Sequence, residues 1–133
     1  MFDRLPMVAV IFALLAALIH ILFFVLESLL FRRPFAWQTF GIKSQADAET
    51  TRDWALNQGF YNLFLAIGVI VGVVLAAGDD PAAVGAGVGM VLLGTGSMLG
   101  AAVVLLITKP RLLRGVLIQG VPPLVAIIAV VLG

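Results

Sequence analysis

Four long stretches of almost uncharged sequence constrain this chain more than any other feature. They cover residues 5–31, 55–77, 82–108 and 112–132. Each one supplies the roughly 20 apolar residues that a helix needs to cross the hydrocarbon core of a membrane. Inside lipid only helices and closed barrels satisfy the backbone, and these stretches lack the alternating pattern of barrel strands. The sequence therefore predicts an all-α, polytopic bundle of four transmembrane helices, with residues 1–133 forming a single domain.

The composition excludes a water-soluble domain and several kinds of site. Hydrophobic residues make up 62% and charged residues 11% of the chain, whereas soluble domains have about 45–50% and about 25%. A formal net charge of +1 offers no basic surface for nucleic acid. With no cysteine and one histidine, the chain lacks the ligands for a thiolate or histidine-rich metal site. We therefore expect neither a metal nor another cofactor.

Turns separate the second, third and fourth apolar stretches, and two prolines interrupt the last one. Residues 78–81 form a tight turn in which Pro81 suits the first position of the next helix, and residues 109–111 form a second short turn. Pro122 and Pro123 lie inside the last stretch and predict a kink there. The second, third and fourth helices are therefore expected to be joined by tight connections.

The first connection, residues 32–54, is longer than the other two. Its polar part, residues 47–53, predicts a short helix that lies along the membrane surface. Trp37 and Trp54 flank this part and are expected to anchor it in the interface, where tryptophan is enriched.

Basic residues are concentrated in two of the three connections. Seven of the eight Lys and Arg side chains are there: Arg32, Arg33, Lys43, Arg52, Lys109, Arg111 and Arg114. Arg4 is alone on the opposite side, where the connection carries Asp79 and Asp80. The positive-inside rule then predicts cytoplasmic basic connections and external termini in a multi-pass membrane protein.

Two titratable side chains, His20 and Glu27, interrupt the first apolar stretch. Because seven residues make two helical turns, the two side chains share one face, about 10 Å apart along the axis. An ionisable group inside a membrane costs about 2.5–3.5 kcal/mol and is a functional candidate for that reason. We expect His20 and Glu27 to be the catalytic residues of any acid–base chemistry.

Further polar side chains are predicted at the same membrane depth as Glu27. Asn57 and Tyr61 are four residues apart, as are Gln58 and Asn62, and Gln119 enters from the same side on the last stretch. If these groups faced lipid, their amides would be left without hydrogen bonds. They are therefore candidate ligand-binding residues in a cytoplasm-facing cluster, although interhelical hydrogen bonds that only hold the bundle together would use them equally well.

Glycines also recur at a spacing of four residues. The pairs are Gly68 with Gly72, Gly85 with Gly89, and Gly96 with Gly100. Small residues at this spacing let helix backbones approach closely. Both packing within the bundle and a homodimer contact would use such a pattern.

Three blocks of the sequence form a recognisable pattern: His20-Ile-Leu-Phe-Phe-Val-Leu-Glu27, Phe40-Gly41, and Asn57-Gln58-Gly59-Phe60-Tyr61-Asn62 with the Leu63-Phe64-Leu65-Ala66 that follows. The pattern resembles a family of small bacterial integral membrane proteins known as domain of unknown function 1304. The resemblance extends over nearly the whole chain, and Phe31 stands where many members have tryptophan. It implies a multi-pass bundle in a bacterial inner membrane but brings no established activity.

Three functions are compatible with these residues. The first is an intramembrane pocket that binds or processes a lipid or small amphipathic molecule, with or without catalysis. The second is a small proton-coupled transporter that uses Glu27 and dimerises through the glycine pairs. The third is an accessory or scaffold subunit of a membrane complex, whose polar groups only join helices.

Overall fold

The computed structural model describes residues 4–133, and this part of the chain contains helices and no strands. The long helices are α1 (Met7–Phe24), α3 (Gln45–Ala76), α4 (Pro81–Thr108) and α5 (Leu113–Leu132). A π-helical turn, η1 (Val25–Leu29), extends α1, while α2 (Pro34–Thr39) and the 3₁₀ turn η2 (Pro110–Leu112) lie in connections. Four helical segments are long and apolar enough to cross a membrane, which confirms the predicted fold class.

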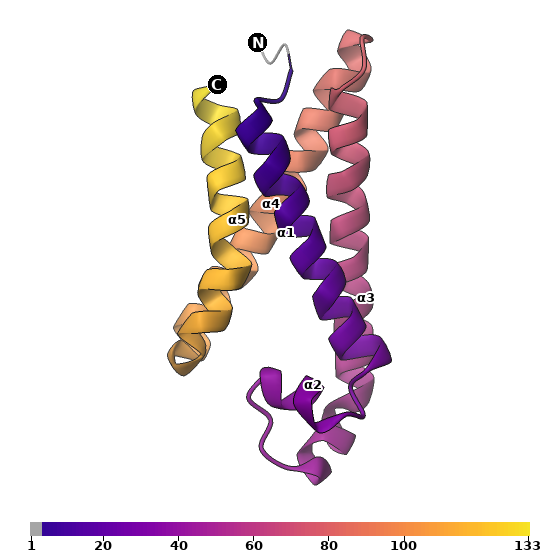
Figure 1. Cartoon of the computed structure of the whole chain (residues 1–133), viewed down its shortest axis with the longest axis vertical. Coiled ribbons are helices and arrows are strands. Elements are labelled where there is room, and N and C mark those ends of the chain that lie inside the picture. The colour runs from indigo at the N-terminus through magenta and orange to yellow at the C-terminus, as the bar shows by residue number, and fades with distance from the viewer. Residues whose placement is uncertain (1–3) are drawn as a thin grey trace.

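The four long helices surround a common axis. Helix α1 packs against α3 and α5, and α4 packs against the same two helices from the other side. Figure 1 shows the start of α1, the end of α5 and the α3–α4 turn at one end of the bundle, with α2 and the α4–α5 turn at the other. Toward that second end, α1 and α3 diverge from α4 and α5. Because successive long helices run in opposite directions, the first and third connections share one end.

All seven cations of the two basic connections belong to the end that carries α2 and η2, which we call the basic end. At the opposite end, Arg4 donates a hydrogen bond to Asp79 over 2.9 Å. Asp80 caps α4 there, accepting from the Ala83 amide at 2.8 Å, and Pro81 opens the helix as predicted. The charge asymmetry seen in the sequence is thus an asymmetry between the two ends of the fold.

The core between the long helices is built from small side chains. Its fully buried members are Ala13, Ala16, Ala17, Ala66, Val69, Val91, Met98 and Ala126. Large apolar side chains instead point outward along every long helix. This distribution suits lipid, because apolar surface need not be hidden from a bilayer and close helix packing depends on small residues.

The polar run at residues 47–53 is not a separate surface helix, so that prediction is wrong. It forms the first turns of α3, which begins at Gln45 with Ser44 as its cap; the Ser44 hydroxyl accepts from the Asp47 amide at 3.1 Å. Helix α3 has 32 residues, or about 48 Å, so it extends beyond a hydrocarbon core of about 30 Å. The short helix of this connection is α2, which precedes the polar run.

The two tryptophans have different environments. Trp54 is 77% exposed, as an interfacial anchor would be. Trp37 is only 5% exposed and packs with Phe31 and Ala48 in a small core that fixes α2 to the start of α3. The prediction that Trp37 is an interfacial anchor is therefore wrong, because the connection folds back on itself.

Of the six glycines in the three predicted pairs, Gly72 alone packs closely against a neighbouring helix. Gly72 lies at the crossing of α3 and α4, where an added Cβ would lie 2.8 Å from the Gly87 carbonyl oxygen. Gly87 and Gly94, which belong to no predicted pair, complete this crossing. The other five predicted glycines would have nothing within 4 Å of an added Cβ: Gly68, Gly85, Gly89, Gly96 and Gly100. For these five, packing within the bundle is wrong, and the homodimer contact stays a prediction.

Candidate functional site

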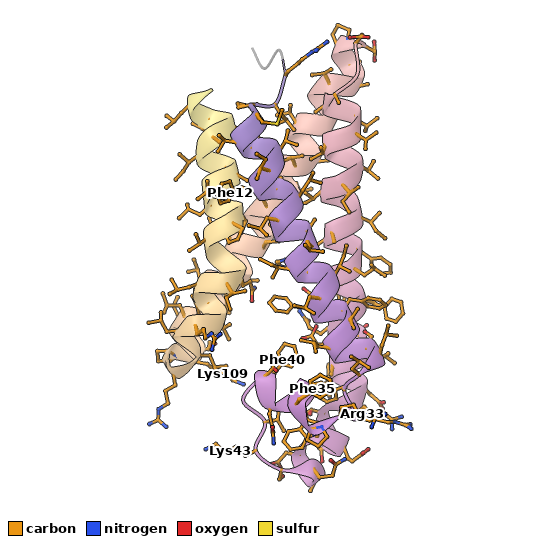
Figure 2. The ribbon with its side chains drawn as sticks, in the orientation of Figure 1. Phe12, Arg33, Phe35, Phe40, Lys43 and Lys109 are labelled. Carbon is orange, nitrogen blue, oxygen red and sulfur yellow. The ribbon has the colours of Figure 1, made fainter. Side chains whose placement is uncertain are left out.

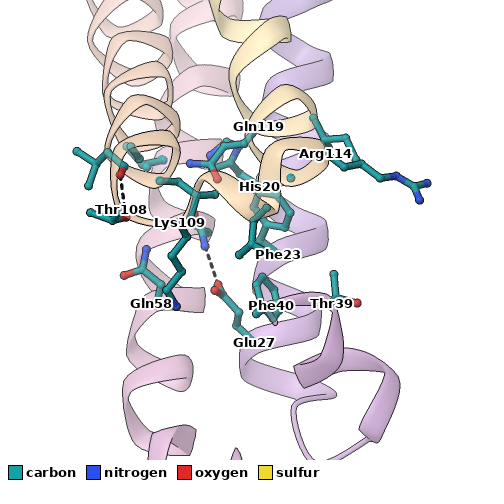
Figure 3. A pocket seen from close by; sticks show the side chains of 18 of the residues that line it. His20, Phe23, Glu27, Thr39, Phe40, Gln58, Thr108, Lys109, Arg114 and Gln119 are labelled. Carbon is teal, nitrogen blue, oxygen red and sulfur yellow. Dashed lines mark hydrogen bonds between the residues drawn. The ribbon is translucent and has the colours of Figure 1, made fainter. Parts of the chain in front are cut away.

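A partly open cavity of about 840 Å³ lies at the basic end, between the diverging helices (Figure 3). Its polar lining comes from all four long segments: His20, Glu27, Gln58, Asn62, Thr108 and Gln119. Its apolar lining includes Phe23, Leu65, Val104, Leu105 and Ile118. The cavity therefore offers both hydrogen-bonding groups and hydrocarbon contact.

Five of the seven candidate residues predicted from the sequence line this cavity: His20, Glu27, Gln58, Asn62 and Gln119. Asn57 and Tyr61 are not part of its lining, and Tyr61 is 59% exposed. The reason is the register of α3, since successive residues are about 100° apart around a helix. The face with Asn62 turns inward, so the Asn57–Tyr61 pair faces out of the bundle.

Glu27 lies in η1 rather than in a regular α-helix. Asn62 Nδ2 donates a hydrogen bond of 2.7 Å to Glu27 Oε2, joining η1 to α3. Among residues 4–133 this is the one side-chain hydrogen bond to Glu27, so its Oε1 is left for a ligand.

Gly59 lets η1 approach α3 closely enough for the Glu27–Asn62 bond. A Cβ at this position would overlap the Ser28 hydroxyl and would lie 3.1 Å from Glu27 Cβ. Ser28 Oγ itself donates to the Leu56 carbonyl at 3.0 Å. Sequence reasoning did not assign Gly59 or Ser28 a role. The available signal was a glycine inside a helix, which costs about 1 kcal/mol relative to alanine and so indicates close contact.

Gly59→Ala is expected to weaken this junction, because Ser28 must rotate and give up its bond to Leu56. Unfolding in detergent, followed by circular dichroism during titration with SDS, should show a loss of about 1–3 kcal/mol, as overpacking gives. Adding Ser28→Ala removes the overlapping hydroxyl. The double variant should therefore be more stable than Gly59→Ala alone, and equal stability of the two would contradict the proposed contact.

His20 is a buried side chain, 1% exposed, that borders the same cavity. Its Nδ1 lies 2.9 Å from the Ala16 carbonyl oxygen. Since a carbonyl oxygen only accepts, we assign the proton of the neutral ring to Nδ1, which leaves Nε2 as an acceptor. The ring packs edge-on against Phe23, with 5.4 Å between centroids. These contacts hold the imidazole in one orientation.

The Phe40-Gly41 pair covers part of the cavity from the first connection. Phe40 lines the cavity and contacts Phe23 edge-on, with ring centroids 6.2 Å apart. Gly41 has a φ of +78°, a conformation that ends α2 and favours glycine. An added Cβ at Gly41 would lie 3.4 Å from Leu112 Cδ2. The two basic connections therefore meet at the edge of the cavity.

The two prolines of α5 change the backbone beside Gln119. The helix continues through Pro122 and Pro123, and both are buried. Because proline has no N–H, the carbonyl oxygens of Ile118 and Gln119 lose their helical donors. Both of these residues line the cavity, to which Gln119 contributes an amide side chain.

Metal binding is not supported by the arrangement of ligands. Within residues 4–133, no three His, Cys, Asp or Glu side chains gather closely enough to hold a metal ion. His20 and Glu27 would provide two strong ligands, which is fewer than a structural or catalytic zinc site uses. What the cavity offers is hydrogen-bond acceptors, amides, the cations Lys109, Arg111 and Arg114, and apolar surface.

The sequence matches one protein family, described as "Protein of unknown function (DUF1304)", over residues 14–131. The matched region contains all seven predicted site residues, together with Gly59 and the Phe40-Gly41 pair. No curated protein and no solved structure matches the chain. The function must therefore be argued from the cavity.

Proposed function

We propose that this chain, which belongs to the DUF1304 family, binds a lipid or small amphipathic molecule in the cavity at its basic end. The observation that carries the proposal is the cavity itself, which collects scarce polar groups from all four helices beside an apolar wall. Small-molecule sites usually have volumes of about 300–1,000 Å³ and mostly apolar linings with a few polar groups. A cavity of about 840 Å³ with this lining falls in that class.

The polar groups suit the head of an amphipathic molecule. Glu27 Oε1 and His20 Nε2 are free to accept hydrogen bonds, and the Gln58 and Gln119 amides can donate them. Phe23, Leu65 and Ile118 would contact the apolar part. If the protein also processes its ligand, Glu27 and His20 would be the groups that exchange protons with it.

The cavity supports this function over the two alternatives. A scaffold whose polar residues only join helices would gain nothing from leaving them around an open volume. A proton-coupled transporter would use the same Glu27 and would need a dimer through the outer glycines. Substrate-dependent proton flux into liposomes would distinguish that function from simple binding.

Filling the cavity should abolish binding without disturbing the fold. Gly115 borders the cavity and an added Cβ there meets nothing within 4 Å, so Gly115→Leu places new side-chain volume in the empty space. Native mass spectrometry of the purified protein with monooleoylglycerol and oleoyl lysophosphatidic acid measures retention of a single-chain amphiphile. We expect Gly115→Leu to reduce retention at least about tenfold, which corresponds to about 1.4 kcal/mol of binding free energy.

The matched control is Gly89→Leu. Gly89 also has nothing within 4 Å of an added Cβ, but it does not line the cavity. This variant should retain the amphiphile as the unchanged protein does. If neither amphiphile is retained by the unchanged protein, or if both variants lose retention equally, the cavity is not the binding site.

We further propose that the basic end faces the cytoplasm of a bacterial cell and that both termini are outside, as the distribution of Lys and Arg favours. The chain has no cysteine, so single-cysteine variants report position without background. Ala46 is exposed at the basic end and Ala82 at the opposite end. In intact spheroplasts, a membrane-impermeant maleimide should label Ala82→Cys and should label Ala46→Cys only after permeabilisation. The reverse labelling would overturn the proposed orientation.

A further inference from the structure

Three cations border the cavity in addition to its neutral polar groups. Lys109 and Arg111 come from the connection between α4 and α5, and Arg114 comes from the first turn of α5. Across the cavity from them, Glu27 provides the carboxyl group of the lining. The positive-inside rule explains cations at this end of the bundle, but it does not require them to border an internal volume.

Lys109 differs from Arg114 in the direction of its side chain. In Figure 3 the Lys109 side chain extends into the cavity toward Gln58 and Glu27, whereas the Arg114 guanidinium points away from it. Figure 2 likewise shows Lys109 directed into the space between the helix pairs. Among residues 4–133, no carboxylate lies within 4.0 Å of the Lys109 ammonium group. Lys109 therefore presents a positive charge to the cavity that no acidic side chain of the described chain neutralises.

A cation facing a partly apolar cavity without a protein partner favours an anionic ligand. Hydrogen bonds to charged groups are about twice as strong as neutral ones. Glu27 Oε1, on the facing wall, accepts hydrogen bonds and would repel a second anion placed beside it. A ligand that satisfies both walls carries its negative charge near Lys109 and a hydroxyl group near Glu27.

We infer that the ligand is an amphiphile with an anionic head group that also carries a hydroxyl, and that Lys109 binds the anion. The inference rests on the proposed function, because it names the chemical class of the molecule in the same cavity. The head group lies between Lys109, Gln58 and Glu27, and the chain lies against Phe23, Leu65 and Ile118.

The test compares three probes that share one oleoyl chain and a glycerol backbone. Oleoyl lysophosphatidic acid carries an anionic phosphate and a hydroxyl, monooleoylglycerol lacks the phosphate, and oleoyl lysophosphatidylcholine has no net charge. Binding is measured by native mass spectrometry of the whole chain released from a neutral detergent. We expect lysophosphatidic acid to bind about tenfold more tightly than the other two, as a hydrogen bond to a charged group allows.

The variant is Lys109→Gln and its matched control is Lys43→Gln. Lys43 is an exposed lysine at the same end that does not line the cavity. Lys109→Gln should remove the preference for lysophosphatidic acid and leave monooleoylglycerol binding within about twofold, while Lys43→Gln should leave the preference in place. Loss of the preference in both variants would show a general charge effect and overturn the assignment of Lys109.

Two further outcomes separate this inference from the proposed function. Equal binding of all three probes, unaffected by Lys109→Gln, would overturn the anionic ligand while supporting an amphiphile cavity. Absence of binding by any probe would overturn both.

Added inorganic phosphate should not displace lysophosphatidic acid, because phosphate lacks the chain. Displacement by phosphate alone would show that the site takes a free anion and would overturn the lipid assignment.

Discussion

Replacing Glu27 with Gln is expected to reduce amphiphile binding below detection and to slow any turnover by about 10²–10⁴-fold, the range of general acid–base catalysis. The side chains have the same shape, and the Gln amide oxygen can accept the Asn62 bond that Glu27 Oε2 accepts over 2.7 Å. The fold should therefore survive. What changes is the group that faces the cavity, where an amide NH₂ that only donates takes the place of an oxygen that accepts.

Binding by Glu27→Gln is measured with the same oleoyl probes, and turnover by analysing the extracted lipid. Glu49→Gln is the matched control, since Glu49 is an exposed carboxylate at the start of α3 and does not line the cavity. It should behave as the unchanged protein does. If Glu27→Gln instead retains full binding, produces unchanged proton flux and complements a deletion strain, the catalytic and proton-coupling roles of Glu27 both fail.

Gly87→Ala is expected to be the most damaging small substitution in the fold. An added Cβ would lie 2.5 Å from both the Gly72 carbonyl oxygen and the Ala76 nitrogen. These are backbone atoms, so no side chain can rotate to make room, and α3 and α4 must move apart. We expect a loss of about 1–3 kcal/mol in unfolding free energy, despite alanine's better helix propensity.

The measurement is an SDS titration of the protein in mixed micelles, followed by circular dichroism. Gly115→Ala is the control, because it adds the same methyl group to a helix where nothing lies within 4 Å. That variant should be as stable as the unchanged protein or slightly more so. A Gly87→Ala protein that unfolds together with the control would show that α3 and α4 do not cross at this glycine.

The membrane architecture could be predicted from the sequence because it depends on the hydrophobicity of each segment taken alone. Crossing a bilayer requires about 20 apolar residues in succession, and that property is visible without any knowledge of neighbours. The α4 helix, Pro81–Thr108, differs by one residue from the predicted stretch. Likewise, His20 and Glu27 stood out because ionisable groups are rare in such stretches. Both line the cavity.

The limits of the prediction appear on α3. Asn57, Gln58, Tyr61 and Asn62 lie at one membrane depth, and the sequence could not say which of them face inward. Depth is set along the chain, but the inward face depends on which side of the helix a neighbour occupies. Gly59 decides this by admitting η1, so Gln58 and Asn62 line the cavity, whereas Asn57 and Tyr61 do not.

The glycines show the same division. Their spacing indicated close helix approach, yet Gly72, Gly87 and Gly94 make the crossing while five of the predicted glycines do not. The sequence by itself determined the class of protein and the four membrane spans. It also determined the unequal distribution of basic residues between the two ends of the bundle and the two titratable groups inside the first span. Only the tertiary structure decided which small residues touch, that Glu27 bonds to Asn62 and that Lys109 faces them across a cavity. The physical reason is that membrane insertion depends on the summed hydrophobicity of one segment. The rotation of a helix about its axis, and the contacts it makes, depend instead on the surface of the neighbouring helix.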